Sequence, residues 1–366
     1  MPGSFRLRLP PLICLIALLW PALAQANAGT PLMWLGAFHL LLGNFFIALF
    51  ELWLLQRFVR RDRLHDKRNF GLLLLANYLS AWAGFGVLQL LDLGRWVDLH
   101  NALYVAWLAL PLAWLFTVLL EWPFVWLALR DLRRSGRQAL RASFLIQTIS
   151  YLPLLLLYLF VAPVQLSMLS QTELSSAGSM RVPAGLQVYF LSADRTEVLV
   201  WESRGIQKVA TVESHDCKGL ELGVEDHTPQ PRLVLLDRYP LCMKQLNIPL
   251  AGPWASVTGW PRDRLRIQAG KAARFPAVAS SSVSFQGGFW PGDGLLVTAG
   301  GRSWRLATES PVLAWRVTYV QHLPGNLALF QLGSDQIVLY DPLRNQLALL
   351  GRGRSPLAVL PSPASH

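Results

Sequence analysis

The chain has 366 residues, of which 53% are hydrophobic and only 15% are charged. A typical soluble domain has about 25% charged residues, so this composition excludes a disordered chain and argues against a fully soluble enzyme. The formal net charge of +11 is a feature of nucleic-acid-binding proteins. However, residues 57–69 and 130–141 contribute +8 of it and lie beside long apolar runs. We therefore attribute the charge to membrane topology and expect no nucleic-acid partner.

Residues 1–28 have the layout of a secretory signal. Two arginines precede an apolar stretch over residues 9–23, and Ala-x-Ala patterns end at residues 26 and 28. This arrangement predicts a signal peptide that is cleaved. The alternative is an uncleaved first membrane helix, and both interpretations place the following segment on the outer side of the membrane.

Four long apolar runs follow, and each can cross the roughly 30 Å hydrocarbon core of a bilayer as a helix. The two basic segments join the first run to the second and the third to the fourth, and they carry eleven of the twelve Lys and Arg residues in 29–165. By the positive-inside rule these segments are cytoplasmic, so the chain after residue 163 lies outside. We expect a multi-pass protein of a bacterial inner (plasma) membrane, with a membrane domain over 29–162 and spans at 32–56, 70–91, 101–129 and 143–162.

Polar residues inside the runs predict a common layer in the inner half of the membrane. Each run carries one such residue six to nine positions from a basic segment. At ~1.5 Å per residue, all four lie roughly 9–14 Å from that end. The four are Glu51, Asn77, Glu121 and Gln147, and we expect Asn44, Ser80 and Ser150 to extend the layer.

This layer has more than one interpretation. Carboxylates inside a membrane are costly and face protein or water, so Glu51 and Glu121 are candidates for a proton or cation site. Alternatively, a protonated glutamic acid donates to an amide on a neighbouring helix and fixes the register of the bundle. A third alternative places Glu121, which precedes Trp122 and Pro123, at the inner headgroup region.

The C-terminal half has a different pattern. Residues 163–180 are rich in small polar residues and predict a linker. Over residues 181–366 short apolar runs alternate with turn residues, which predicts an all-β domain in the periplasm. Residues 186–201 and 327–342 share an apolar run, a Ser/Asp turn and a second apolar run. About 180 residues at ~40–45 per unit favour a propeller-like domain over a sandwich or an irregular barrel.

Cysteines and acidic residues in this domain give weaker signals. Cys217 and Cys242 are a candidate disulfide in an oxidising compartment, and the alternative is a buried strand around Cys242. Residues 213–229 contain weak metal-ligand candidates at spacings that match no known ligand set, so we favour a solvated loop and expect no metal or cofactor. These candidates are His215, Asp216, Asp226 and His227.

No catalytic motif is present: the chain has no phosphate-binding P-loop, no HExxH and no GxSxG. We therefore do not expect an enzyme. The leading hypothesis is a binding or scaffolding role, in which helices in the lipid bilayer anchor a β-domain that engages an envelope protein, a ligand or a second copy of the chain. The alternative is transport, in which an oligomeric bundle moves protons or a small cation past Glu51 and Glu121.

Overall fold

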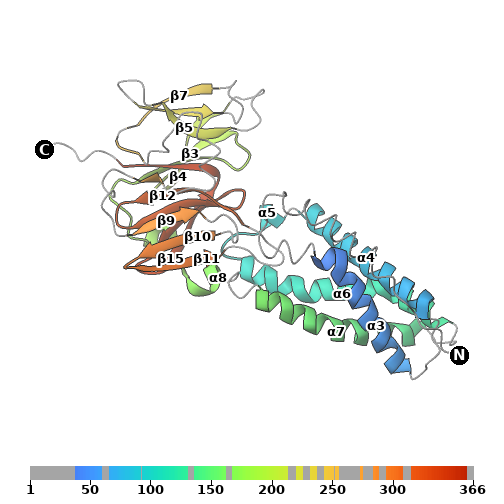
Figure 1. Cartoon of the computed structure of the whole chain (residues 1–366). Helices are drawn as coiled ribbons and strands as arrows, with labels where there is room; N and C mark the ends of the chain where they lie inside the picture. The colour runs from blue at the N-terminus through green and yellow to red at the C-terminus, as the bar shows by residue number, and fades with distance from the viewer. Residues whose placement is uncertain are drawn as a thin grey trace, which may run out of the picture.

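The computed structural model of the chain describes residues 38–59, 66–91, 93–130, 136–161, 167–212, 220–225, 231–236, 243–250, 252–254, 273–274, 283–287, 294–307 and 315–360. These residues form a bundle of long helices with a β region at one end of it (Figure 1). Several sequence-based predictions fall outside the described residues. They are the signal peptide over 1–28, the disulfide between Cys217 and Cys242, and the metal-ligand candidates His215, Asp216, Asp226 and His227.

Among the described residues, four helices are long and apolar enough to cross a membrane, which supports the predicted multi-pass membrane class. The first begins as a short π-helix and the others are α-helical throughout. They are η1 (His39–Gly43) with α3 (Asn44–Val59), α4 (Asp66–Leu90), α6 (Ala102–Leu129) and α7 (Gly136–Val161). The second and fourth helices begin before the expected spans because Lys and Arg residues, which are good helix formers, continue the helix beyond its apolar part.

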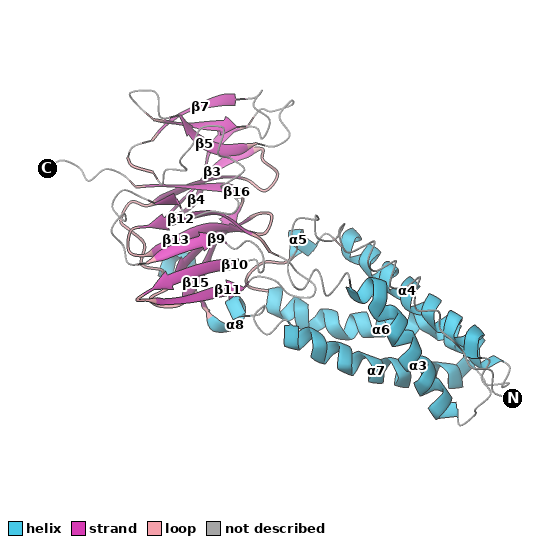
Figure 2. Ribbon diagram, in the orientation of Figure 1, coloured by secondary structure: helices cyan, strands magenta, loops and turns pink. Residues whose placement is uncertain are grey.

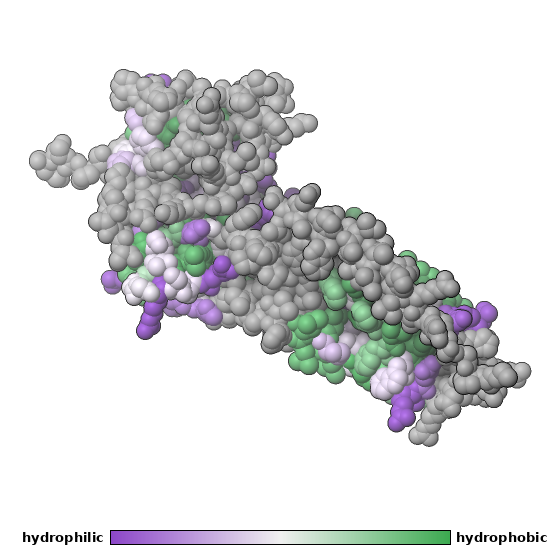
Figure 3. Space-filling view, in the orientation of Figure 1, coloured by the Kyte–Doolittle hydropathy of each residue, from purple (hydrophilic) through white to green (hydrophobic). Residues whose placement is uncertain are grey.

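The four helices close into a bundle in which α3 and α6 each contact both α4 and α7. Consecutive helices run in opposite directions, so the ends of α3 and α6 meet the starts of α4 and α7 at one end. Figure 3 shows hydrophobic atoms over the visible face of the bundle and hydrophilic atoms at the end far from the β region. The exposed basic residues at that end are Arg57, Lys67, Arg130, Arg137 and Arg141.

The described part of the predicted linker belongs to the β region. It contains α8 (Ser167–Gln171), β1 (Glu173–Leu174) and η3 (Ala177–Ser179). Strand β1 pairs in parallel with a strand near the C-terminus, and Met168 and Met180 are buried in two different hydrophobic clusters. The composition predicts a linker because small polar residues dominate it. In the structure, a few apolar side chains hold the segment in place.

The described strands form four sheets, numbered here by their order along the chain. The first sheet contains β2 (Gln187–Leu191), β3 (Glu197–Glu202) and β4 (Gly205–Thr211), completed by β16 (Arg354–Val359). The second contains β5 (Glu221–Glu225), β6 (Arg232–Leu236) and β7 (Met243–Pro249). The third contains β9 (Ser284–Gly287), β10 (Gly294–Ala299) and β11 (Arg302–Ala307). The fourth contains β12 (Val317–Leu323), β13 (Leu327–Leu332), β14 (Gln336–Asp341) and β15 (Gln346–Arg352), flanked by β1 and β8 (Ala273–Arg274).

These sheets pack face to face as layers (Figure 2). One face of the fourth sheet packs on the third sheet and its other face packs on the first sheet, whose far face packs on the second. All residues of β13 and β14 are buried. Residues 327–330 and 337–340 within them are continuous apolar runs because both faces of the sheet are covered.

The described strands do not close into a barrel or a propeller. The second and third sheets lie at the two ends of the stack, and no hydrophobic cluster of described residues joins them. In Figure 1 the strands β5 and β7 lie at the top of the β region, whereas β10 and β11 lie near the helices. The structure therefore supports a β region of several sheets, and not the finer prediction of a propeller.

Candidate functional site

The two carboxylates predicted inside the membrane are joined by one amide group at the centre of the bundle. The Nε2 atom of Gln147, on α7, donates to Glu51 Oε1 at 2.8 Å and to Glu121 Oε2 at 2.5 Å. All three side chains are buried, with exposed fractions of 0%, 1% and 2% for Glu51, Glu121 and Gln147. An amide from the fourth helix therefore bridges acids from the first and the third.

Three further side chains donate to the same carboxylates. Asn77 Nδ2 donates to Glu51 Oε2 at 2.6 Å, and Ser150 Oγ donates to Glu51 Oε1 at 3.2 Å. Ser80 Oγ lies 2.7 Å from Glu121 Oε1. Each of the four carboxylate oxygens thus has at least one donor, and each of the four helices contributes a side chain. We refer to these six residues as the carboxylate network.

The donors have other acceptors nearby. Asn77 Nδ2 also donates to the Leu73 carbonyl at 3.0 Å, one turn earlier in α4. Ser80 Oγ lies 3.1 Å from the Asn77 carbonyl, and Ser150 Oγ lies 3.3 Å from the Gln147 carbonyl. An amide nitrogen carries two hydrogens, but a hydroxyl carries one. Each serine can therefore donate to only one of its two acceptors at a time.

The structure brings Glu51, Asn77, Glu121 and Gln147 into this network, together with both serines. Asn44 is buried but does not join it, because Asn44 Nδ2 points to the Leu40 carbonyl at 3.4 Å. Seven residues along α3 correspond to about 10 Å, which separates Asn44 from Glu51. Glu121 faces the bundle interior, so its placement at the inner headgroup region is not what the geometry shows.

An apolar layer lies between the network and the basic end of the bundle. Its buried side chains come from all four helices and form one hydrophobic cluster. It includes Leu52, Leu55, Leu73, Val125, Leu129 and Ile146. On the other side of the network, Tyr151 and Thr117 form a hydroxyl pair at 2.7 Å, which the sequence did not reveal.

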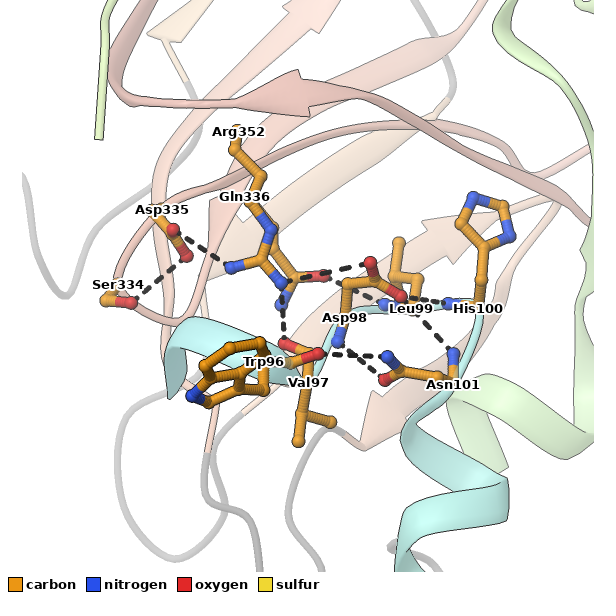
Figure 4. A network of polar contacts seen from close by, with 10 residues as sticks. All are labelled: Trp96, Val97, Asp98, Leu99, His100, Asn101, Ser334, Asp335, Gln336 and Arg352. Atoms are coloured by element: carbon orange, nitrogen blue, oxygen red, sulfur yellow. Dashed lines mark hydrogen bonds and ion pairs between the residues drawn. The ribbon is translucent and has the colours of Figure 1, made fainter. Parts of the chain in front are cut away.

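A second polar site joins the β region to the bundle (Figure 4). Arg352, at the end of β15, forms an ion pair with Asp335 at 3.1 Å and a longer one with Asp98 at 3.8 Å. The same guanidinium donates to the Val97 carbonyl at 3.2 Å. Arg352 therefore connects the last sheet to the loop between α5 (Leu93–Trp96) and α6.

This loop is itself held by local hydrogen bonds. Asp98 Oδ1 accepts from the backbone N–H groups of His100 and Asn101, and Asn101 Oδ1 accepts from the N–H of Asp98. Gln336 Oε1, from β14, accepts from the Leu99 N–H at 2.9 Å. Val97, Leu99 and Ala102 pack into the same hydrophobic cluster as the third and fourth sheets. The β region is thus fixed against the start of α6.

The sequence analysis did not identify this interface. Arg352 and Asp98 lie more than 250 residues apart, so no local pattern relates them. The available signal was Gln336, a polar residue at the start of a run that is otherwise apolar.

Nearby, burial raises the pKa of the Tyr340 phenol above its ordinary value, and its hydroxyl donates to Asn345 Oδ1 at 3.1 Å.

Among the residues that the structure describes, no group of three or more His, Cys, Asp or Glu side chains could hold a metal ion.

Comparison with known proteins found no relative: no family description matches the chain, and no curated protein or solved structure matches it.

Proposed function

We propose that this protein is a multi-pass protein of the bacterial inner membrane whose β region binds or scaffolds an envelope protein or ligand in the periplasm. The basic residues at one end of the bundle favour a cytoplasmic location for that end. The β region lies at the opposite end (Figure 1). The same orientation follows from the predicted signal peptide, which would deliver the segment after it to the outer side.

The observation that carries this proposal is the attachment of the β region to the bundle. A flexible tether would serve for simple anchoring. Here, instead, Arg352, Gln336 and the hydrophobic cluster around Leu99 hold the β region against the start of α6. Such an attachment keeps a binding surface at a fixed height and orientation above the membrane, which suits a scaffold.

The first sheet offers a place for a partner. β4 is the terminal strand of that sheet among the described strands, and most of its residues are exposed. Ile206 and Val209 have exposed fractions of 45% and 39%. A terminal strand presents unpaired backbone groups that another chain can extend. We propose that an envelope protein, or a second copy of this chain, contacts this edge.

The same proposal includes a propeller-like arrangement of the β region, favoured over a sandwich. The sheets stack in the order third, fourth, first, second, which is a cyclic permutation of their order in the chain. The C-terminal strand β16 completes the first sheet by pairing with β2. Both features are typical of propellers, in which one blade combines strands from the two ends of the domain.

Site-directed photo-crosslinking in whole cells tests the binding role. A photoreactive amino acid replaces Lys208 on β4, and in a matched variant it replaces Leu112, which is exposed on α6 within the membrane span. We expect a discrete protein adduct from position 208 and none of the same mass from position 112. The proposal would be overturned if only position 112 gave protein adducts, or if neither position gave any.

The carboxylate network favours a second candidate function, in which the bundle moves protons or a small cation. Buried carboxylates in membrane helices often mark ion pathways. This function requires flux through the wild-type protein that Glu121→Gln abolishes. The apolar layer around Leu55 and Val125 lies across the path to the basic end, so the anchoring role is the better supported one.

A further inference from the structure

We propose that the carboxylate network binds a single proton on Glu121 Oε1, where the new O–H group donates a hydrogen bond to Ser80 Oγ, while Glu51 remains ionised. This inference deepens the second candidate function by naming the proton as the ion that the site holds. A proton site does not require transport, because a bound proton also lowers the free-energy cost of burying two acids in the bundle. Taking an ionised carboxylate out of water costs several kcal/mol.

The count of donor hydrogens distinguishes the two acids. Both hydrogens of the Gln147 amide are used, one on each carboxylate. Both hydrogens of the Asn77 amide are also used, one on Glu51 Oε2 and one on the Leu73 carbonyl. An amide cannot turn to accept a proton without losing these bonds. Any oxygen that faces an amide hydrogen is therefore held as an acceptor.

Glu121 Oε1 is the one carboxylate oxygen of the network whose described donor is a hydroxyl alone. Its neighbour Ser80 Oγ lies 2.7 Å away and has a second acceptor, the Asn77 carbonyl, at 3.1 Å. A hydroxyl can both donate and accept. Ser80 can therefore face either form of Glu121 after rotation of its hydroxyl hydrogen, with no movement of a heavy atom.

The protonation step is balanced as follows. In the ionised form, the Ser80 hydroxyl donates its hydrogen to Glu121 Oε1. When a proton from water forms an O–H bond at Oε1, that new hydroxyl donates to Ser80 Oγ. The Ser80 hydrogen then turns to the Asn77 carbonyl, and the net charge of the two acids changes from −2 to −1. No other bond in the network changes.

Glu51 is suited to the remaining negative charge. Its two oxygens accept from Asn77, Gln147 and Ser150. Three donors directed at one carboxylate favour its ionised form. Ser150 also has an alternative acceptor, but Glu51 Oε1 keeps the Gln147 hydrogen whichever way Ser150 turns. A proton at that oxygen would compete with an existing donor, whereas a proton on Glu121 Oε1 would not.

The same donors argue against a metal cation as the bound ion. Hard cations prefer several oxygen ligands that surround them. In this network the nitrogen ends of Asn77 and Gln147 face the carboxylates, and their N–H groups would oppose a cation there. Two other titratable groups of the bundle are Tyr151 on α7, whose hydroxyl pairs with Thr117 beside the network, and the half-buried His39 in η1, nearer the outer end.

Infrared spectroscopy of the full-length protein in lipid nanodiscs at neutral pH tests this inference. A protonated carboxyl gives a C=O stretching band, separate from the amide bands, that shifts in D2O. We expect this band in the wild type, its loss in Glu121→Gln and its retention in Glu51→Gln. Ser80→Ala removes the hydroxyl that accepts the hydrogen bond of the protonated acid and is expected to shift the band to higher frequency. The matched control Thr148→Ala, which removes an exposed hydroxyl of α7 that donates to the Phe144 carbonyl, should leave it in place.

Loss of the band in Glu51→Gln with retention in Glu121→Gln would place the proton on the other acid and overturn the proposal. Absence of the band in the folded wild type would also overturn it. Proton flux is a separate measurement. A band without flux supports the proton site and rejects transport, whereas flux without a band rejects the site described here and leaves transport standing.

Discussion

At the scale of single residues, the hydrogen bonds of Gln147 make the two glutamates unequal. One amide hydrogen of Gln147 bonds to Glu51 and the other bonds to Glu121. Replacing either acid by glutamine therefore affects a bond of the shared amide. The remaining donors differ as well: Glu51 faces a second amide, whereas Glu121 faces a hydroxyl. This difference has a consequence for the stability of the two glutamine variants.

We predict that Glu51→Gln destabilises the bundle and that Glu121→Gln does not. In Glu51→Gln the new amide nitrogen must face the N–H groups of Asn77 or Gln147. Two hydrogen-bond donors then face each other, and at least one N–H group is left without an acceptor. An unsatisfied buried donor costs about 1–3 kcal/mol. In Glu121→Gln the new nitrogen occupies the Oε1 position and donates to Ser80 Oγ.

Thermal unfolding of the two variants in the same detergent, compared with wild type, measures this difference. We expect a lowered midpoint for Glu51→Gln and a midpoint equal to or above the wild-type value for Glu121→Gln. Equal losses in both variants would contradict the unequal roles of the two acids.

At the interface, we predict that Arg352→Ala loosens the β region from the bundle. The change removes the ion pair with Asp335 and the bond to the Val97 carbonyl. The Arg352 side chain is 28% exposed, so solvent weakens the effect and we expect a loss of about 1–2 kcal/mol in the free energy of unfolding. Hydrogen exchange should become faster over residues 97–101. The control is Lys208→Ala, which removes the exposed pair with Glu197 and should leave that exchange unchanged.

The sequence predicted the depth of the polar residues but not their contacts. Counting residues from the basic segments placed Glu51, Asn77, Glu121 and Gln147 at a common height, because a helix has a constant rise. Which of them meet depends on the rotation and order of the helices, which the spacing does not contain. Asn44 differs from the other four in depth: it lies seven residues from Glu51 along α3 and bonds the Leu40 carbonyl, outside the network.

At the scale of elements, β16 is held by side chains as well as by strand pairing. Gln321, from β12, donates to the Pro356 carbonyl and accepts from the Ala358 N–H at 2.9 Å. Gln331, from β13, accepts from the Ser355 N–H at 2.9 Å. The bonds to Ser355 and Pro356 satisfy backbone groups of β16 where its pairing with β2 is irregular. The C-terminal strand thus connects the first and fourth sheets.

We predict that Gly353→Ala destabilises the β region because β16 approaches β2 too closely at this position. A Cβ atom on Gly353 would overlap the Leu191 carbonyl oxygen, which is backbone and cannot easily move. Overpacking of this kind costs about 1–3 kcal/mol. The matched control is Gly178→Ala, since a Cβ there meets nothing within 4 Å.

Chemical denaturation followed by tryptophan fluorescence compares the two glycine variants. A lower midpoint for Gly353→Ala and no change for Gly178→Ala is the expected result. Equal midpoints for both would mean that the junction between β15 and β16 tolerates a side chain, against the close approach seen in the structure.

The sequence predicted local strands better than their partners. The apolar runs over 186–201 and 327–342 form the hairpins β2–β3 and β13–β14, because a run, a turn and a second run are adjacent in the chain. The pairing of β16 with β2 joins residues far apart, and the parallel pairing of β1 with β15 lies in a segment predicted as a linker. No periodicity encodes such contacts.

At the scale of the whole molecule, the β region and the basic end of the bundle lie at opposite ends of the protein. We predict that a cysteine at position 208 is labelled by a membrane-impermeant maleimide in intact spheroplasts. A cysteine at position 137 should be labelled only after the membrane is permeabilised. Both positions are exposed in the structure, so access to the reagent decides the outcome. The wild type gives the background from native cysteines, and the reverse labelling pattern would contradict the proposed orientation.

Proton flux in proteoliposomes tests most directly whether the bundle is an anchor for the β region or a conducting element. We predict that vesicles containing the wild-type protein hold an imposed pH gradient as long as protein-free vesicles, because the apolar layer around Leu55 and Val125 separates the carboxylate network from the basic end. A faster loss of the gradient in the wild type, which Glu121→Gln abolishes while the protein stays folded, would contradict the anchoring role and establish transport instead.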